Sequence, residues 1–524
     1  MNALLVLFAG DLSDEAVQPL VNGRNSLILA LEQARNFPGV GKVVLLTGQW
    51  EEFPPVSEGI LVEKRDLWTV KALLEALAVH GEGFDVTYFA WADCPFLDPE
   101  LAGRLAERHI RYAAEYSYAD GWPYGLAPEL LSPGTAAILA KILECDGPVG
   151  RDALFSVIQK DINAFDIETE ISPVDLRCRR LNLCADSRRN LLLLRHFADH
   201  ASSPSGIPDT AAVERIIAEK PEILRTLPAF YPVQVYGGCP HTCVWCPWPQ
   251  AAGDLTQRRD YMDVPQFESL LEKIAAFSGD AVIDLSLWGE LALHPQKMEL
   301  IGMVLKRPEL ALVIETSGIG WKNSELESCA ELAQTAQART DAAVKRKSPL
   351  PPLSWIVSLD ASDPARYKEI RGAGFAEAND CAKKLLSLFP KDAYVQAVRV
   401  AGAEDDIERF YRSWKEITPS SANIIIQKYD DFCGALPRKQ ASDLSPVQRQ
   451  PCRHLMRDMP VLIDGTVPLC RQQIADGNKC VIGNAFTEPL DVIWERGQAL
   501  YVSQTVKKYD SRCAGCDEYY TYNF

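Results

Sequence analysis

Three cysteines lie close together in the middle of the chain, in the segment Cys239-Pro-His-Thr-Cys243-Val-Trp-Cys246. Thiolates are soft ligands that suit iron–sulfur clusters and zinc. Three of them on one tight loop can hold three irons of a cubane cluster and leave the fourth iron open to a small molecule. A structural zinc ion normally takes a fourth protein ligand, for which His241 is nearby. The spacing favours an iron–sulfur cluster, and zinc stays as the alternative.

A second group of cysteines lies near the end of the sequence, in a C-x12-G-x4-C motif that contains Gly465 and in a later C-x2-C pair. Its members are Cys452, Cys470, Cys513 and Cys516. Four thiolates can close one iron–sulfur cluster or one zinc ion. Cys433 and Cys480, in the same part of the chain, are interpreted as buried thiols without a metal.

Composition limits what these cysteines can be. The chain has 524 residues, a net charge of −17 and 47% apolar residues, which indicates several globular domains. An acidic chain is a poor partner for nucleic acid. The N-terminus lacks the basic region and cleavage site of a signal peptide, and no apolar run approaches membrane-spanning length. We therefore expect a cytoplasmic protein without membrane contact. Its 15 cysteines should serve packing, metal binding or catalysis instead of disulfides.

The elements that must position these residues form three predicted domains. In the first, 1–205, apolar runs at 4–10, 42–48 and 86–92 alternate with helical patterns, which predicts a parallel α/β sheet. The second, 211–440, contains six such runs separated by helices. This alternation predicts a partial (β/α)6 barrel with its chemistry at the carboxyl ends of the strands. The third, 445–524, is short and rich in turns, so a metal would stabilise it.

The C-x3-C-x2-C motif, with Trp245 before its last cysteine, resembles the signature of the radical S-adenosylmethionine (SAM) enzymes. The resemblance implies a [4Fe-4S] cluster whose open iron chelates SAM. Reductive cleavage of SAM would then give a 5′-deoxyadenosyl radical that abstracts a hydrogen atom from a substrate. Trp245 would pack near the adenine.

Later strand ends resemble the same family in order. Leu-Trp-Gly-Glu-Leu at 287–291 resembles its Gly-Gly-Glu-Pro element, with Trp288 in place of the first glycine. Gly289 would let the backbone approach SAM closely, and Glu290 would accept a hydrogen bond from the SAM ammonium. Thr316 and Ser317, in Glu-Thr-Ser-Gly, would bind the ribose or the methionyl part.

The fourth strand and its helix extend the likeness. Ser358 would point at SAM, and Arg371 would pair with its carboxylate. Asp360 is either a helix N-cap or a polar residue of the site. The sequence identifies no catalytic base, and Asp360, Asp430 and Asp431 are the candidates.

The C-terminal cysteines resemble the SPASM/twitch extension of radical SAM enzymes, and residues 211–524 as a whole resemble the spiro-SPASM proteins. A full SPASM domain carries seven cysteines for two auxiliary clusters. Here the C-x2-C pair lies close to the end of the sequence. The resemblance therefore implies one auxiliary [4Fe-4S] cluster, held by Cys452, Cys470, Cys513 and Cys516.

The first domain resembles nucleotidyltransferases of the cytidylyltransferase type, in which a strand-end aspartate, here Asp93, helps to bind a metal–nucleotide. Active members carry a basic glycine-rich loop after the first strand that neutralises triphosphate charge. In this chain the loop contains three early acids, Asp11, Asp14 and Glu15, and only Arg24 as a base. We interpret the domain as a degenerate transferase that binds a ligand or serves as a scaffold.

Together these features predict a radical SAM oxidoreductase or modifying enzyme with two [4Fe-4S] clusters. Its substrate would be a peptide or protein, or a small molecule such as a sugar or aminosugar. Its electrons would come from a donor such as flavodoxin or ferredoxin. Two alternatives are a nucleotidyltransferase with a structural zinc or iron–sulfur module and a metal-stabilised binding protein without catalysis.

Overall fold

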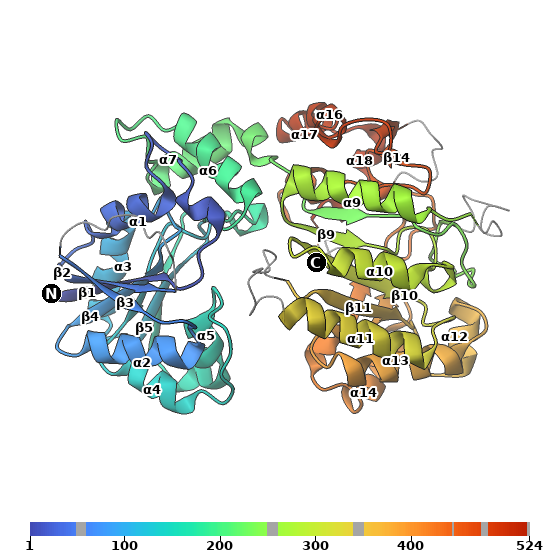
Figure 1. The fold of residues 1–524 in the computed structure, drawn as a ribbon, viewed down its shortest axis with the longest axis horizontal. Coiled ribbons are helices and arrows are strands. Elements are labelled where there is room, and N and C mark those ends of the chain that lie inside the picture. Colours follow the sequence, from blue (N-terminus) through green and yellow to red (C-terminus); the bar gives the residue numbers. More distant parts are fainter. Residues whose placement is uncertain (49–58, 249–259, 339–349, 443–444, 473–479, 521–524) are drawn as a thin grey trace. The chain divides into compact units, whose positions relative to one another are not determined.

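The structure is a computed structural model that describes residues 1–48, 59–248, 260–338, 350–442, 445–472 and 480–520. The chain divides into two compact units, Met1–Thr226 and Leu227–Phe524 (Figure 1). Helix α7 (Thr210–Glu219), placed by sequence at the start of the second domain, groups with the first unit. The predicted boundaries of three domains stay a prediction. Among the described residues, no helix is both long and apolar enough to span a bilayer.

The first unit is a seven-stranded sheet with the strand order β3-β2-β1-β4-β6-β5-β7. Its strands are β1 (Ala3–Ala9), β2 (Val40–Thr47), β3 (Ile60–Lys64), β4 (Val86–Trp91), β5 (Tyr116–Asp120), β6 (Glu129–Leu131) and β7 (Ile167–Ile171). Its helices are α1 (Ser26–Ala34), α2 (Val70–Gly81), α3 (Pro99–Arg111), α4 (Thr135–Ile142), α5 (Ala153–Ile158), α6 (Arg188–Asp199) and α7.

The central strands of this sheet explain why the sequence shows unbroken apolar runs. All residues of β1 and β4 are buried, as expected for parallel strands covered on both faces. The prediction of a parallel α/β sheet is confirmed for β3, β2, β1 and β4. It is wrong for β6, which runs antiparallel to both of its neighbours. The three residues of β6 are too few to show a strand pattern in sequence.

The second unit contains a six-stranded parallel sheet whose strands follow in chain order, β8 to β13. These are β8 (Phe230–Pro232), β9 (Ala281–Asp284), β10 (Leu310–Thr316), β11 (Leu353–Ser358), β12 (Ala393–Arg399) and β13 (Ile424–Lys428). The helices between them are α9 (Val264–Ser278), α10 (Lys297–Leu305), α11 (Asn323–Ala338), α12 (Pro364–Ile370), α13 (Phe375–Leu388) and α14 (Glu404–Lys415). This open sheet confirms the predicted partial barrel, because every strand pairs only with the next and all pairs are parallel.

The C-terminal part of this unit is built from short elements. They are α15 (Arg453–Arg457), β14 (Thr466–Pro468), β15 (Val481–Asn484), α16 (Leu490–Arg496), α17 (Gln498–Thr505) and α18 (Ser511–Ala514). β14 and β15 are antiparallel, and Gly465 takes a positive φ of 82° just before β14. Gly465 therefore lies in a turn ahead of β14, in which its amide donates to the Leu462 carbonyl at 2.9 Å, and the β14–β15 hairpin begins after this turn.

The first strand of the barrel is covered by a later segment of the chain. The Met459 amide donates to the Phe230 carbonyl at 3.0 Å, and the Val461 amide donates to the Pro232 carbonyl at 2.8 Å. The two segments run parallel. The C-terminal region thus adds backbone pairing along β8 and belongs to the same compact unit as the barrel.

Candidate functional site

A pocket of about 250 Å³ lies at the carboxyl ends of the barrel strands. Its lining includes every residue that the sequence assigns to the first cluster or to SAM, and two of the three candidate bases: Cys239, Cys243, Cys246, Trp245, Gly289, Glu290, Thr316, Ser317, Ser358, Asp360, Arg371 and Asp430. Asp431 is not part of this lining; its carboxylate accepts from the amide of Gly434, in the turn after β13. Parallel strands that follow one another in chain order bring their ends to one rim, which gathers these side chains.

Close backbone packing positions the cysteine loop. The Glu290 amide donates to the Gly238 carbonyl at 2.9 Å, directly before Cys239. A Cβ atom on Gly289 would lie 1.7 Å from the Tyr236 carbonyl oxygen. Glycine is therefore required at 289 for the strand end to approach the protein's own backbone at Tyr236, and the predicted approach to SAM stays a prediction.

The three thiols have the surroundings of cluster ligands. Burial raises the pKa of Cys239 and of Cys246 to about 12, and backbone amides that donate to the sulfurs oppose this increase. Amide donors to thiolate sulfur are a usual feature of iron–sulfur sites. Burial alone keeps the thiols protonated. Iron binds the thiolate form, so binding to iron would release the thiol protons.

The spacing of the sulfurs bears on the choice between a cluster and zinc. Four thiolates around one zinc ion lie about 3.8 Å apart, because each Zn–S bond is about 2.3 Å. Over the described part of the chain, no three sulfurs from either cysteine group all lie within 4.8 Å of one another. This spread fits a cubane cluster better than a single ion.

His241, the candidate fourth zinc ligand, is bonded elsewhere. Its Nε2 lies 3.0 Å from the Ala373 carbonyl oxygen, to which it donates. Burial lowers its pKa to about 4, so the ring is neutral. The His241 side chain thus anchors the cysteine loop to the segment after α12, while the three cysteines line the pocket.

Glu290 lines the pocket, but its carboxylate is bonded to the end of β10. Its carboxylate accepts from the Thr316 hydroxyl at 2.7 Å and from the amide and hydroxyl of Ser317 at 2.8 and 2.7 Å. The Ala292 amide adds a fourth donor at 3.2 Å. A carboxylate has about four acceptor positions, so Glu290 is saturated by the protein.

Glu315 lines the pocket and was not assigned a role from sequence. Its Oε1 accepts from the Ser358 hydroxyl at 2.7 Å and from Gln396 Nε2 at 2.8 Å. No donor among the residues described is bonded to its other oxygen, Oε2. Glu315 directly precedes Thr316 at the end of a predicted strand, and this position could have indicated from sequence that it belongs to the site.

Asp360 and Arg371 form an ion pair in the wall of the pocket, with Nη1 2.6 Å from Oδ2. Asp360 also accepts from Trp245 Nε1 at 3.3 Å and from the Val398 amide at 2.8 Å. The N-cap of α12 is Asp363. The helix-cap interpretation of Asp360 is therefore wrong; Asp360 lies in the wall of the pocket, and its role in a SAM site stays a prediction.

Three non-glycine residues of the pocket have left-handed backbone. They are Trp288 (φ 50°), Asp360 (φ 63°) and Phe432 (φ 50°). This conformation is costly for a bulky side chain and concentrates at functional sites. The Trp288 ring stacks on Trp248 with centroids 6.2 Å apart and contacts Phe432 at 5.5 Å. These rings form an aromatic wall of the pocket. Its central residue, Trp288, stands where the resembled family has a glycine.

Residues from the end of β13, from the loop after it and from the C-terminal region line one end of the pocket, here called its far end. Lys428, Asp430 and Arg471 line it, and sequence reasoning missed both basic residues. Burial raises the pKa of Asp430 to about 7. Lys428 Nζ lies 2.8 Å from Asp517 Oδ2, next to Cys516. This end of the pocket therefore contacts the C-terminal cysteine segments.

The four C-terminal cysteines face one another. Burial, followed by the nearby thiols of Cys452, Cys516 and Cys513, raises the pKa of Cys470. Amides donate to two of the sulfurs at 3.4 Å, from Gln472 to Cys470 and from Glu518 to Cys516. These amide donors again fit metal-bound thiolates.

The two further cysteines of this region are not isolated. The thiol of Cys433 is hydrogen-bonded to that of Cys516, which raises the Cys433 pKa. Cys480 accepts a hydrogen bond from the Arg512 guanidinium.

In the first unit, Asp93 lies directly after β4, as predicted, and is buried. Arg151 donates to both of its oxygens, at 2.8 and 2.5 Å. This ion pair uses one acceptor position on each oxygen of the carboxylate that the resemblance assigns to a metal–nucleotide.

Comparison with known proteins assigns the C-terminal region. Residues 452–517 match the family model of SPASM, an iron–sulfur cluster-binding domain. The match spans all four cysteines of the second group and confirms the expected SPASM domain and its iron–sulfur cofactor.

A protein of Treponema pallidum (strain Nichols) is 35% identical over 378 residues, which cover 71% of this chain and 98% of that protein; its function is uncharacterised. A cytidylyltransferase structure from Leptospira borgpetersenii is 16% identical, with a TM-score of 0.36, and covers 43% of this chain and 95% of that one. Streptococcus suis SuiB bound to its precursor peptide SuiA is 14% identical, with a TM-score of 0.41, and covers 70% of this chain and 84% of that one. Because both TM-scores are low, the fold assignment rests on the strand order and pairing described above.

The identity to the Treponema pallidum protein and the match to the SPASM model together assign the chain. It belongs to the family of the Treponema pallidum protein and carries an iron–sulfur cluster-binding SPASM domain at residues 452–517.

Proposed function

We propose that the chain is a radical SAM enzyme and that Cys239, Cys243 and Cys246 hold its SAM-binding [4Fe-4S] cluster. One observation carries the proposal: the three thiols share a single pocket with polar side chains from the ends of successive parallel strands. When bound, this cluster would supply the electron that cleaves SAM and so start hydrogen abstraction from a substrate.

The hydrogen bonds of the pocket refine the proposed SAM contacts. Glu290 is saturated, so its role is to fix Thr316 and Ser317 at the rim. Glu315, whose Oε2 is not bonded within the described structure, is the better acceptor for the SAM ammonium. Arg371 already balances Asp360, and it can share its remaining donors with the SAM carboxylate. Gly289, Ser358 and Trp245 complete the wall.

The SPASM domain would hold one auxiliary [4Fe-4S] cluster on Cys452, Cys470, Cys513 and Cys516. Lys428 contacts the segment of Cys516, and Arg471 directly follows Cys470. This cluster would therefore lie beside the far end of the substrate pocket, where it could bind substrate or accept an electron. A peptide and a sugar or aminosugar are the substrate classes, with flavodoxin or ferredoxin as electron donor.

The test is anaerobic purification of the full chain, followed by metal analysis and reduction with dithionite in the presence of SAM. Two clusters require about eight irons per chain, and we expect 5′-deoxyadenosine as a product. The triple variant C239A/C243A/C246A should lose about half the iron and all SAM cleavage. The double variant C513A/C516A should keep at least half the iron.

The matched control is Cys178→Ala, an exposed thiol of the first unit, which should change neither the iron content nor SAM cleavage. SAM cleavage that survives in the triple variant would refute the site. A colourless protein without iron would refute the whole proposal.

A further inference from the structure

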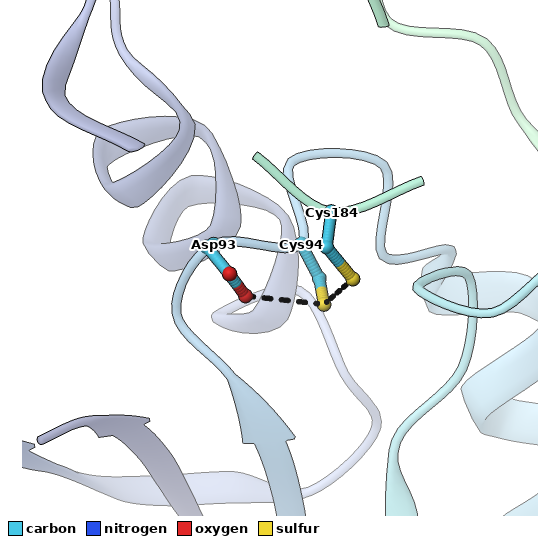
Figure 2. A group of neighbouring side chains, drawn as sticks. All are labelled: Asp93, Cys94 and Cys184. Carbon is cyan, nitrogen blue, oxygen red and sulfur yellow. Dashed lines mark hydrogen bonds between the residues drawn. The ribbon is translucent and has the colours of Figure 1, made fainter. Parts of the chain in front are cut away.

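A second metal-ligand cluster lies in the first unit, remote in sequence from the cysteines above. Asp93 and Cys94 follow β4, and Cys184 lies in a later segment that folds back on them (Figure 2). The two sulfurs are 3.3 Å apart, and Cys94 Sγ is 3.8 Å from Asp93 Oδ1. All three ligand atoms lie within 4.8 Å of one another, and the residues are at most 2% exposed.

Backbone hydrogen bonds hold this arrangement in place. The Ala185 amide donates to the Asp93 carbonyl at 2.8 Å, and the Ala92 amide donates to the Phe8 carbonyl at 2.9 Å. The thiols are therefore brought together by the sheet and by the returning segment. Such prepositioned ligands lose little conformational entropy when a metal binds.

The distances match a single tetrahedral ion. Zinc bonds of about 2.3 Å to sulfur and about 2.0 Å to oxygen place two sulfurs about 3.8 Å apart and a sulfur and an oxygen about 3.5 Å apart. The observed 3.3 Å between the sulfurs and 3.8 Å between Cys94 Sγ and Asp93 Oδ1 differ from these values by about half an ångström or less, and Cys184 Sγ lies within 4.8 Å of the carboxylate. The iron–sulfur cysteines of the second unit are more widely spread, so the two kinds of site differ in geometry.

The charges of the cluster favour a divalent cation. With both thiols ionised, the three ligands carry −3 and Arg151 carries +1, which leaves a net charge of −2. One Zn²⁺ would neutralise it, and a buried site is stable only when its charges are compensated. With both thiols protonated, Asp93 and Arg151 balance each other. These four groups therefore have the same net charge with and without the ion, and Asp186, which Arg151 also contacts at 3.4 Å, adds one negative charge in both states.

Arg151 does not block metal binding. A carboxylate has about four acceptor positions, and Arg151 uses two of those on Asp93. Its guanidinium also stacks over Trp91, with the central carbon 4.2 Å from the ring centroid. Arg151 would thus orient the metal-bound carboxylate through hydrogen bonds, as partners of metal ligands usually do.

We propose that Asp93, Cys94 and Cys184 bind one Zn²⁺, with water in the fourth position. Thiolates suit zinc and are avoided by magnesium, so this site differs from the metal–nucleotide role that the family resemblance gives to Asp93. The proposal is independent of the radical SAM assignment, since it concerns the other unit of the chain.

The test measures zinc in the anaerobically purified full chain after a wash with chelator. We expect about one zinc per chain beside the iron, and X-ray absorption at the zinc edge should show two sulfurs at about 2.3 Å and two oxygen or nitrogen ligands at about 2.0 Å. This edge reads zinc alone, so the iron does not interfere. The double variant C94S/C184S should lose at least ten-fold in zinc and keep its iron.

The matched control is C145S/C178S, which removes two exposed thiols of the same unit and should keep the zinc. The absorption experiment on the unmodified chain decides the matter even if C94S/C184S fails to fold. Absence of zinc, a zinc bound by four sulfurs, or a Cys94–Cys184 disulfide found by mass spectrometry would each overturn the proposal.

Discussion

The Glu290 carboxylate accepts from both the amide and the hydroxyl of Ser317, at 2.8 and 2.7 Å. This double contact joins the loop after β9 to the end of β10, next to the cysteine loop. It also explains how a fully buried carboxylate is tolerated at this place: strong donors replace the water that it has lost.

Replacement of Glu290 by Gln should destabilise the second unit by about 2 kcal/mol, because an amide group would face donors where the carboxylate accepts. Thermal unfolding should show a lower melting temperature. The control is Glu268→Gln on the exposed face of α9, which should leave the melting temperature unchanged. Equal melting of the two variants would contradict this role of Glu290.

Gly289→Ala should disrupt the cysteine loop. The added methyl group would overlap the Tyr236 carbonyl oxygen at 1.7 Å, and neither can move away by side-chain rotation, because the backbone fixes both positions. We expect a loss of several kcal/mol in stability, typical of strong overpacking, and a fall in bound iron to about the amount of one cluster. Gly302→Ala is the control, because a Cβ there meets open space in α10. It should leave the iron content unchanged and slightly raise the melting temperature.

The left-handed backbone of Trp288 can be tested by two substitutions that both remove the ring. Trp288→Gly and Trp288→Ala lose the same contacts with Trp248 and Phe432, but only glycine relieves the strain at φ 50°. The glycine variant should be the more stable of the two by about 1 kcal/mol. Denaturant unfolding measures the difference, and an alanine variant at least as stable as the glycine variant would show that position 288 is not strained.

His109 should make the first unit sensitive to acid. Burial lowers its pKa to about 4, and its ring nitrogens lie 2.7 and 3.0 Å from the hydroxyls of Ser117 and Ser132. The unfolded chain takes up this proton near pH 6.5, while the folded chain does so only near pH 4. The folding stability that depends on a neutral His109 is thus complete above pH 6.5, and about 2–3 kcal/mol is lost between pH 6.5 and 4.

His109→Gln should remove this part of the pH dependence. Melting temperatures of the variant should therefore fall less steeply between pH 7 and 4 than those of the unmodified chain. His200→Gln, at an exposed histidine, is the control and should keep the steep fall. Parallel profiles for His109→Gln and the unmodified chain would contradict the interpretation.

The pocket could be predicted from sequence to the extent that it is made by strand ends. The cysteine spacing, Gly289 and the apolar runs are local patterns, and the parallel strand order brings them together by a general rule. Lys428 ends the sixth predicted strand and could have been included by the same rule. The helix-cap reading of Asp360 failed because Asp363, three residues later, takes that position.

Other parts of the site depend on contacts that sequence spacing does not encode. Arg471 reaches the pocket from the SPASM domain, after a return of the chain that no local pattern specifies. Glu290 looked free to bind SAM because its partners, Thr316 and Ser317, were themselves assigned to SAM. Cys94 and Cys184 are 90 positions apart, so no local spacing pairs them.

The pairing of residues 459–461 with β8 affects how this protein would lose its native structure when it is damaged. β8 is the edge strand of the open sheet, and its backbone is covered on that side by a segment that leads directly into the SPASM hairpin. Loss of the auxiliary cluster would loosen this segment and uncover the edge, which is a template for pairing with other chains. Damage by oxygen would then appear first as aggregation, before the rest of the barrel unfolds.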